Sequence, residues 1–200
     1  MNFRFGLTII DEIKDRQLLS FTPVRLAYLP TFTADTLLPY LRMRGYLSRL
    51  EVIPYLGAFN QVQQEVLSTS SALYDFGPDV IVLAVRSQEF VPDLYANYVN
   101  LATDGRVQQT VDSNVESVRE MVTAIRGRCD AMIVLHNFDP PPFPDLGQLD
   151  LQNVAGQIAT FHQLNARLSQ VAAEFSNVYV LDYAHLVARV GFSNWHDRRM

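Results

Sequence analysis

The sequence predicts an α/β fold: a single doubly wound, mostly parallel sheet of five strands, layered between helices. Five short runs rich in apolar and β-branched residues alternate with four stretches of helical periodicity, the pattern of β-α-β units. The runs are continuously apolar, as expected of strands buried on both faces. The chain has 200 residues and 48% hydrophobic content, enough for one domain with a complete core. We expect the strand order 2-1-3-4-5, a common one for five strands.

The predicted strands are bounded by turn-forming residues. In chain order they cover residues 24–29 (VRLAYL), 50–56 (LEVIPYL), 79–85 (DVIVLAV), 131–135 (AMIVL) and 177–183 (NVYVLDY). Pro54 in the second run has no amide proton to donate to a ladder, so this strand is expected at an edge of the sheet. The third run, which follows Gly77 and Pro78, has the strongest strand pattern in the chain.

Helical periodicity separates the strands. The predicted helical stretches cover residues 34–49, 59–76, 111–125 and 151–175. In the third stretch, apolar residues from Val111 to Ile125 recur at helical spacing and share one face, and Gly127 stands where a helix end favours glycine. We expect residues 1–21 to be a helical or partly ordered lead-in, and residues 22–200 to form the domain.

The bulk composition argues against several classes of protein. A net charge of −5 without a basic stripe argues against nucleic-acid binding. No apolar run approaches the ~20 residues that cross a bilayer, and Asp11 and Glu12 interrupt the N-terminal stretch where a signal peptide would be apolar. Cys129 is the only cysteine, so no intramolecular disulfide is expected. We therefore expect a cytoplasmic protein.

The chemistry is expected at the carboxyl ends of the strands, where doubly wound sheets bind ligands. The segments that follow strands one, three, four and five are residues 30–36 (PTFTADT), 86–90 (RSQEF), 136–142 (HNFDPPP) and 182–186 (DYAHL). In the third segment, His136, Asn137 and Asp139 could form a site with a wall stiffened by prolines. Alternatively, Asn137 and Asp139 cap turns and the prolines end the strand.

The loop after strand one also has two interpretations. Thr31, Thr33 and Thr36 give the spacing T-x-T-x-x-T, similar to the hydroxyl-rich phosphate loop of flavodoxins. The loop has no glycine for close backbone approach, however, and Asp35 would repel a phosphate. We favour Thr33 as the N-cap of the next helix, with Asp35 complementing the helix dipole. A flavin carrier is the weakest hypothesis, and no cofactor is expected.

Common catalytic and metal-binding motifs do not occur in the sequence. It contains no HExxH pair, no GxSxG elbow and no GxxxxGK[ST] loop. A metal site is therefore not expected. Of the four histidines, His136 and His196 are the two that could reach the strand ends.

Several segments, taken as a set, resemble the N-terminal domain of FkbH-like proteins. They are VRLAYLPTFTADTLLPYLRMRGY, LEVIPYLGAFNQVQQEVLSTSSALYDFGPDVIVLAV, IVLHNFDPPP, VYVLDYAHLVARVG and NWHDRR. The most specific part is S-x-L-Y-x-F-x-P-D-V, residues 71–80. The resemblance covers about residues 22–200.

The resemblance implies an SGNH-hydrolase-like domain that acts with a C-terminal HAD-type domain. FkbH-like proteins serve polyketide-type biosynthesis, where a glyceryl unit from a phosphorylated three-carbon donor is loaded onto an acyl carrier protein. The HAD half carries the catalytic aspartates, and this sequence has no D-x-D-x-T signature of that half. The implied partners are thus a HAD-type domain, on the same or a separate chain, and an acyl carrier protein.

An active SGNH hydrolase has a serine nucleophile after strand one, an oxyanion-hole asparagine after strand three, and a late histidine three residues after an aspartate. This chain has Thr31 and Thr33 at the first place and Arg86 and Ser87 at the second. His196 is suitably late, but a serine stands three residues before it. Because a hydrolase needs nucleophile, base and oxyanion donors together, classical hydrolysis is not expected.

The preferred hypothesis is a domain that binds a carrier protein or a glyceryl- or acyl-phosphopantetheine unit for a HAD partner. Its candidate residues are Thr31, Thr33, Arg86, Ser87, His136, Asn137 and His196. Arg86 is the natural anion ligand, unless it pairs with Glu89 or Asp93. The second hypothesis is an esterase or acyltransferase with Thr31 or Thr33 as nucleophile, His196 as base and Asn137 as oxyanion donor.

Overall fold

In the computed structural model, which describes residues 20–195, five strands form one sheet in the order β2-β1-β3-β4-β5, with every pair parallel. The strands are β1 (Thr22–Pro30), β2 (Leu50–Leu56), β3 (Val80–Ala84), β4 (Met132–His136) and β5 (Val178–Leu181). The predicted fold class and strand order are confirmed. Pro54 lies in β2 at the sheet edge, where a residue without an amide proton is tolerated.

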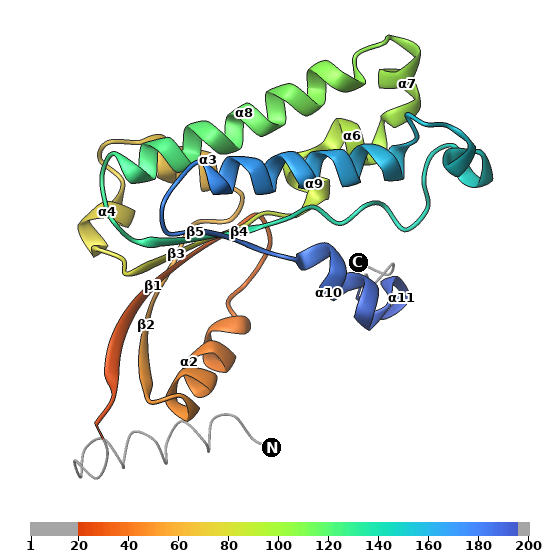
Figure 1. Cartoon of the computed structure of the whole chain (residues 1–200). Helices are drawn as coiled ribbons and strands as arrows, with labels where there is room; N and C mark the ends of the chain where they lie inside the picture. The colour runs from red at the N-terminus through yellow and green to blue at the C-terminus, as the bar shows by residue number, and fades with distance from the viewer. Residues whose placement is uncertain (1–19, 196–200) are drawn as a thin grey trace.

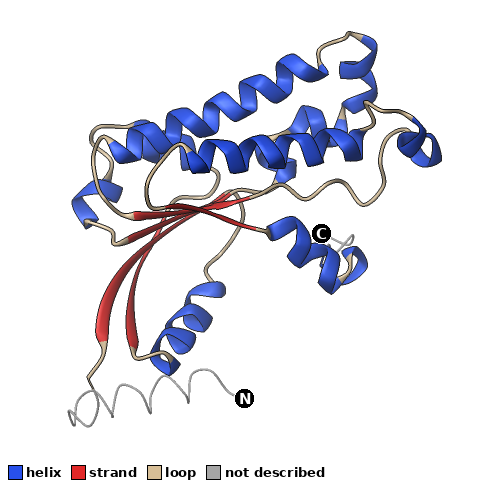
Figure 2. Cartoon of the chain, viewed as in Figure 1, coloured by secondary structure: helices blue, strands red, loops and turns tan. Residues whose placement is uncertain are grey.

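Helices cover the two faces of the sheet unequally (Figures 1 and 2). One face carries α3 (Val62–Leu67), α4 (Ala72–Phe76), α8 (Val107–Arg126) and α9 (Gln157–Ala173). At the carboxyl end of β3 follow α5 (Ser87–Phe90), α6 (Pro92–Ala96) and α7 (Tyr98–Thr103), and a 3₁₀ helix, η1 (Gly147–Gln152), precedes α9. The other face carries α2 (Leu37–Leu47), α10 (Tyr183–Val190) and α11 (Phe192–Trp195).

The helices differ from the sequence prediction in several places: α8 begins at Val107, and α5, α6 and α7 were not predicted. The stretch 59–76 is two helices, because the Ser71 hydroxyl accepts a hydrogen bond from the Leu73 amide and starts a second helix there. Thr33 is not a helix N-cap: a turn closed by the Leu37 amide on the Ala34 carbonyl delays α2, so Thr36 takes the cap position. The last predicted stretch begins late, since Asp150 caps α9 at Gln157.

The face under α8 and α9 holds the main core. Both helices present an apolar stripe to the alternate residues of β3 and β4. The buried members of these four elements include Ile81, Leu83, Val111, Val115, Val118, Val122, Ile125, Ile133, Leu135, Phe161, Leu164, Leu168 and Val171.

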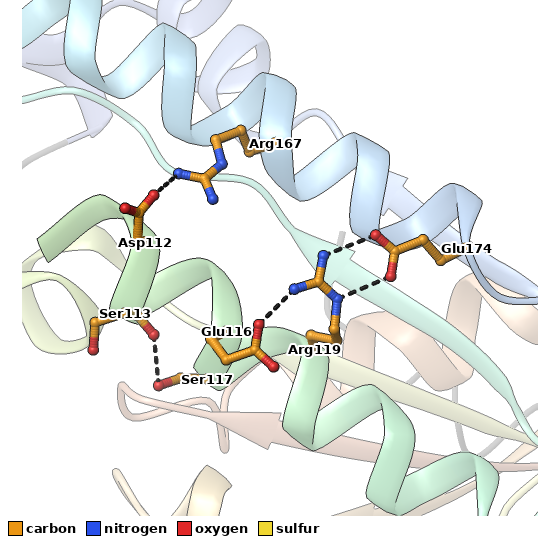
Figure 3. Close-up of polar contacts among 7 residues, drawn as sticks. All are labelled: Asp112, Ser113, Glu116, Ser117, Arg119, Arg167 and Glu174. Atoms are coloured by element: carbon orange, nitrogen blue, oxygen red, sulfur yellow. Dashed lines mark hydrogen bonds and ion pairs between the residues drawn. The ribbon is translucent and has the colours of Figure 1, made fainter. Parts of the chain in front are cut away.

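On the outer side of this layer, ion pairs join α8 to α9 (Figure 3). Arg119 bridges to Glu174 at 2.8 Å, and Arg167 pairs with Asp112. Such exposed pairs align two helices and contribute little to stability.

The opposite face of the sheet is only partly covered. A small cluster of Tyr28, Ala34 and Ala84 forms under α2, whereas Tyr179 and Leu181 of β5 stay 54% and 43% exposed. Within residues 20–195, no helix combines the length and hydropathy that a bilayer crossing requires. The predicted lead-in of residues 1–21 lies almost wholly outside the described residues. Phe21 is described and packs edge-to-face on Tyr46.

Candidate functional site

A cavity of about 1000 Å³ lies on the partly covered face, between α2 and α10 at the carboxyl ends of the strands. Its lining comes from all four strand-end segments that the sequence singled out. The lining residues are Tyr28, Phe32, Thr33, Ala34, Thr36, Leu37, Leu41, Val82, Arg86, Gln88, Tyr95, Val134, His136, Pro142, Leu181, Tyr183, Leu186 and Trp195. This volume is at the upper end of the range for pockets that enclose drug-sized ligands.

The register of the strands forms the floor of the cavity. Tyr28 of β1 is paired with Val82 of β3, and Val82 with Val134 of β4, so these three side chains share one face. One step further along, His136 is paired with Leu181. Strand alternation thus places one polar ring at the carboxyl end of an apolar floor.

His136 is nearly enclosed, with 5% of its surface exposed. Its ring stacks on Tyr183, with centroids 5.1 Å apart, and the Tyr28 ring meets it edge-on at 6.5 Å. Nδ1 is buried without a hydrogen-bond partner. Burial lowers the pKa of His136 from 6.5 to about 4, because a charged imidazolium would be poorly solvated here. At neutral pH the ring is uncharged.

Arg86 contributes the charge at the cavity. Its guanidinium lies 5.7 Å from the centroid of the Phe32 ring, and Nη2 donates a 2.9 Å hydrogen bond to Gln88. The expected competing ion pair with Glu89 is present, although loose at 3.8 Å. Because the side chain is 31% exposed and only loosely paired, its remaining donors can meet a ligand anion.

Thr31, Ser87 and Asn137 do not line the cavity; they form the frame around it. Thr31 Oγ1 accepts a 2.9 Å hydrogen bond from the Arg86 amide, and the Ser87 hydroxyl lies 2.8 Å from Oδ1 of Asp139. All three side chains are buried. These bonds fix the ends of β1, β3 and β4 relative to one another.

Asn137 connects β4 to the start of α10. Its amide group donates to Asp182 at 2.9 Å, and its oxygen accepts from the Ala184 amide at 2.8 Å. Asp182 also accepts from the His185 amide, which caps α10. Hydrogen bonds from Asn137 and from the His185 amide hold the pKa of Asp182 below its usual value. This network places Tyr183, the first residue of α10, over His136.

The residues of the predicted site therefore divide into two groups. Thr33, Arg86 and His136 line the cavity, whereas Thr31, Ser87 and Asn137 hold the surrounding loops. His196 lies outside the described residues. In the proline-rich segment, Pro142 lines the cavity, and the Asp139 carboxylate accepts a hydrogen bond from the Ser87 hydroxyl.

Five aromatic residues of the lining escaped the sequence reasoning. They are Tyr28, Phe32, Tyr95, Tyr183 and Trp195. Each lies within or near a strand-end segment, so aromatic enrichment at strand ends is the signal that could have identified them. Residues 20–195 also bring together no group of three or more His, Cys, Asp or Glu side chains able to bind a metal ion.

Comparison with known proteins identifies the family. The sequence model described as "FkbH, N-terminal domain" matches residues 25–200. The chain belongs to the FkbH N-terminal domain family. A search of curated proteins found no match for this FkbH domain.

A solved structure shares the fold of the FkbH domain. It is the N-terminal part of the protein BF1531 from Bacteroides fragilis, described as containing a phosphatase domain and complexed with Mg. The TM-score is 0.75 at 16% sequence identity, with 90% of this chain and 45% of that chain covered. This FkbH domain thus spans less than half of that solved chain, and the likeness establishes a shared α/β architecture.

Proposed function

We propose that this FkbH domain binds an acyl or glyceryl unit on the phosphopantetheine arm of an acyl carrier protein and presents it to a HAD-type phosphatase partner in polyketide-type biosynthesis. The observation that carries the proposal is the cavity of about 1000 Å³ with Arg86 in its lining. A pantetheine-linked unit is long and mostly uncharged, and its phosphate is an anion at one end. An uncharged body with one terminal anion matches a cavity that has an apolar floor and one arginine in its lining.

The partner in the proposal is supported by the solved relative, which carries a phosphatase domain on the same chain. The role of binding rather than cleavage is supported by the surroundings of the threonines. Thr31 is buried and already accepts the Arg86 amide proton. Thr33 lines the cavity, and none of the hydrogen bonds of the described residues joins it to a base.

Intrinsic fluorescence tests the proposal, because Trp195 is the single tryptophan of the chain and lines the cavity. Titration with acyl-phosphopantetheine should shift its emission with a saturable curve. Arg86→Gln should weaken this ligand roughly 10-fold, the scale of one charge-assisted hydrogen bond, and leave acyl-pantetheine without the phosphate unchanged. Arg106→Gln, at an exposed pair with Asp104, is the matched control. Equal affinity of both ligands for all three proteins would rule out the anion role of Arg86.

An esterase is the second candidate, favoured only by Thr33 in the lining. It predicts turnover of p-nitrophenyl acetate that is lost in Thr33→Ala and in His196→Ala. Equal inactivity of the unmodified domain and both variants would leave binding as the function.

A further inference from the structure

The cavity is much larger and less polar than a three-carbon glyceryl unit requires. Its floor consists of Tyr28, Val82 and Val134, and α2 and α10 add leucines to the walls. Among the described lining residues, Arg86 alone carries a full charge. A small polyhydroxy acid would leave this apolar surface in contact with water and would gain little from it.

His136 is a polar residue of the lining to which the proposed function assigns no contact with the ligand. It is the only histidine among the described lining residues, and it is almost completely buried. Its Nδ1 has no partner, so a proton there would be a buried unsatisfied donor. Buried N–H groups without partners are rarer than unpaired acceptors, so the proton belongs on Nε2. The ring then offers one uncharged donor to whatever fills the cavity.

Two tyrosines hold His136 in this role. Tyr183 stacks on its ring, and Tyr28 meets it edge-to-face. The Tyr183 hydroxyl is engaged by the Trp195 indole N–H at 2.7 Å. Burial, together with the nearby Tyr183, raises the pKa of Tyr28 to about 12, so its phenol is also uncharged. No permanent charge faces the centre of the cavity from these groups.

We propose that the cavity selects an acyl group with an extended apolar body, held by a hydrogen bond from His136 to its carbonyl oxygen. A medium-chain acyl thioester is the ligand class that this combination fits. The inference rests on the proposed function for the thioester linkage, but the selection by His136 can be tested without it.

The test follows Trp195 fluorescence with two matched probes, the decanoyl thioester of N-acetylcysteamine and the decyl thioether of the same thiol. They differ by one carbonyl oxygen. His136→Phe, which keeps an aromatic ring against Tyr183, should weaken the thioester about 5- to 10-fold, the scale of one buried hydrogen bond, and leave the thioether unchanged. Equal loss for both probes would mean a purely structural role for His136 and would overturn the proposal.

Chain length gives a second measurement that does not depend on how well the His136 variant folds. The glyceryl thioester of N-acetylcysteamine should bind at least 10-fold more weakly than the decanoyl thioester. Val134→Phe, which fills the floor, should abolish this preference. Equal affinity for glyceryl and decanoyl thioesters would overturn the proposal while leaving carrier-arm binding intact.

Methyl decanoate, an ester without a thioester or a pantetheine arm, tests the selection by His136 separately from the pantetheine function. If it binds with dependence on His136 and the thioesters do not bind, the pantetheine function fails and the selection by His136 stands. If no probe binds, both fail.

Discussion

The two faces of this sheet are built from the same five strands and have opposite properties. Under α8 and α9, long helices with continuous apolar stripes leave little space, and ion pairs such as Arg119 to Glu174 align them on the outside (Figure 3). Under α2 and α10, shorter helices lie apart and a cavity of about 1000 Å³ remains between them. The first face holds the main core, and the second leaves strand residues exposed to the cavity.

Truncating a buried side chain on the face under α8 and α9 should give the largest change in the free energy of unfolding. Phe161 is 1% exposed and packs against Tyr95, so Phe161→Ala should lower the free energy of unfolding by about 3–5 kcal/mol. Leu41→Ala, on the cavity side, should cost less than about 2 kcal/mol, since fewer contacts are lost beside an existing void. Urea unfolding of both variants measures the difference, and equal losses would contradict the contrast between the faces.

The next largest effect is the dependence of folding stability on pH that His136 introduces. The His136 imidazole takes up a proton near pH 6.5 in the unfolded chain and only near pH 4 in the folded chain. The stability that the neutral ring contributes is therefore complete above pH 6.5 and is lost as the pH falls toward 4. Between pH 7.5 and 4.5 the loss should be about 2–3 kcal/mol.

His136→Phe isolates this contribution, because the other titrating groups are common to both proteins. The drop in unfolding free energy between the two pH values should be smaller in the variant by that amount. An identical drop in both proteins would show that the ring is protonated at its ordinary pKa.

A smaller effect is expected at two helix caps on opposite faces. Asp182 caps α10 and Ser71 caps α4, and replacing either by alanine should cost about 1 kcal/mol. Only Asp182→Ala should also weaken binding in the cavity, because Asp182 and Asn137 together place Tyr183. Thermal unfolding measures the stability of both variants, and titration followed by Trp195 fluorescence measures their ligand binding. Loss of binding in Ser71→Ala would refute the specific role of Asp182 in placing Tyr183.

The smallest effect is expected at the ion pairs of the packed face. Arg119→Gln removes the contacts to Glu116 and Glu174, yet exposed pairs are screened by water and salt. The melting temperature should change by a degree or so, and less at high salt. A large shift that persists at high salt would show that these pairs hold α8 and α9 together.

Continuous apolar runs and helical spacing are local patterns, so the strands, their parallel order and the long helix α8 could be predicted from the sequence. The sequence also singled out Thr33, Arg86 and His136, which the structure places in the cavity lining. Boundaries that depend on a single side-chain bond, such as the start of α9 at the Asp150 cap, did not follow from those patterns.

The polar residues that line the cavity and those that hold its frame can be told apart only in the folded structure. Thr31, Ser87 and Asn137 have the same chemistry as a ligand site would need, but each finds a partner from a distant segment. The cavity itself arises from the spacing between α2 and α10, which no local pattern encodes. The face of the sheet to which a strand side chain points follows from alternation along the strand. The residue that it contacts there depends on how separate elements pack.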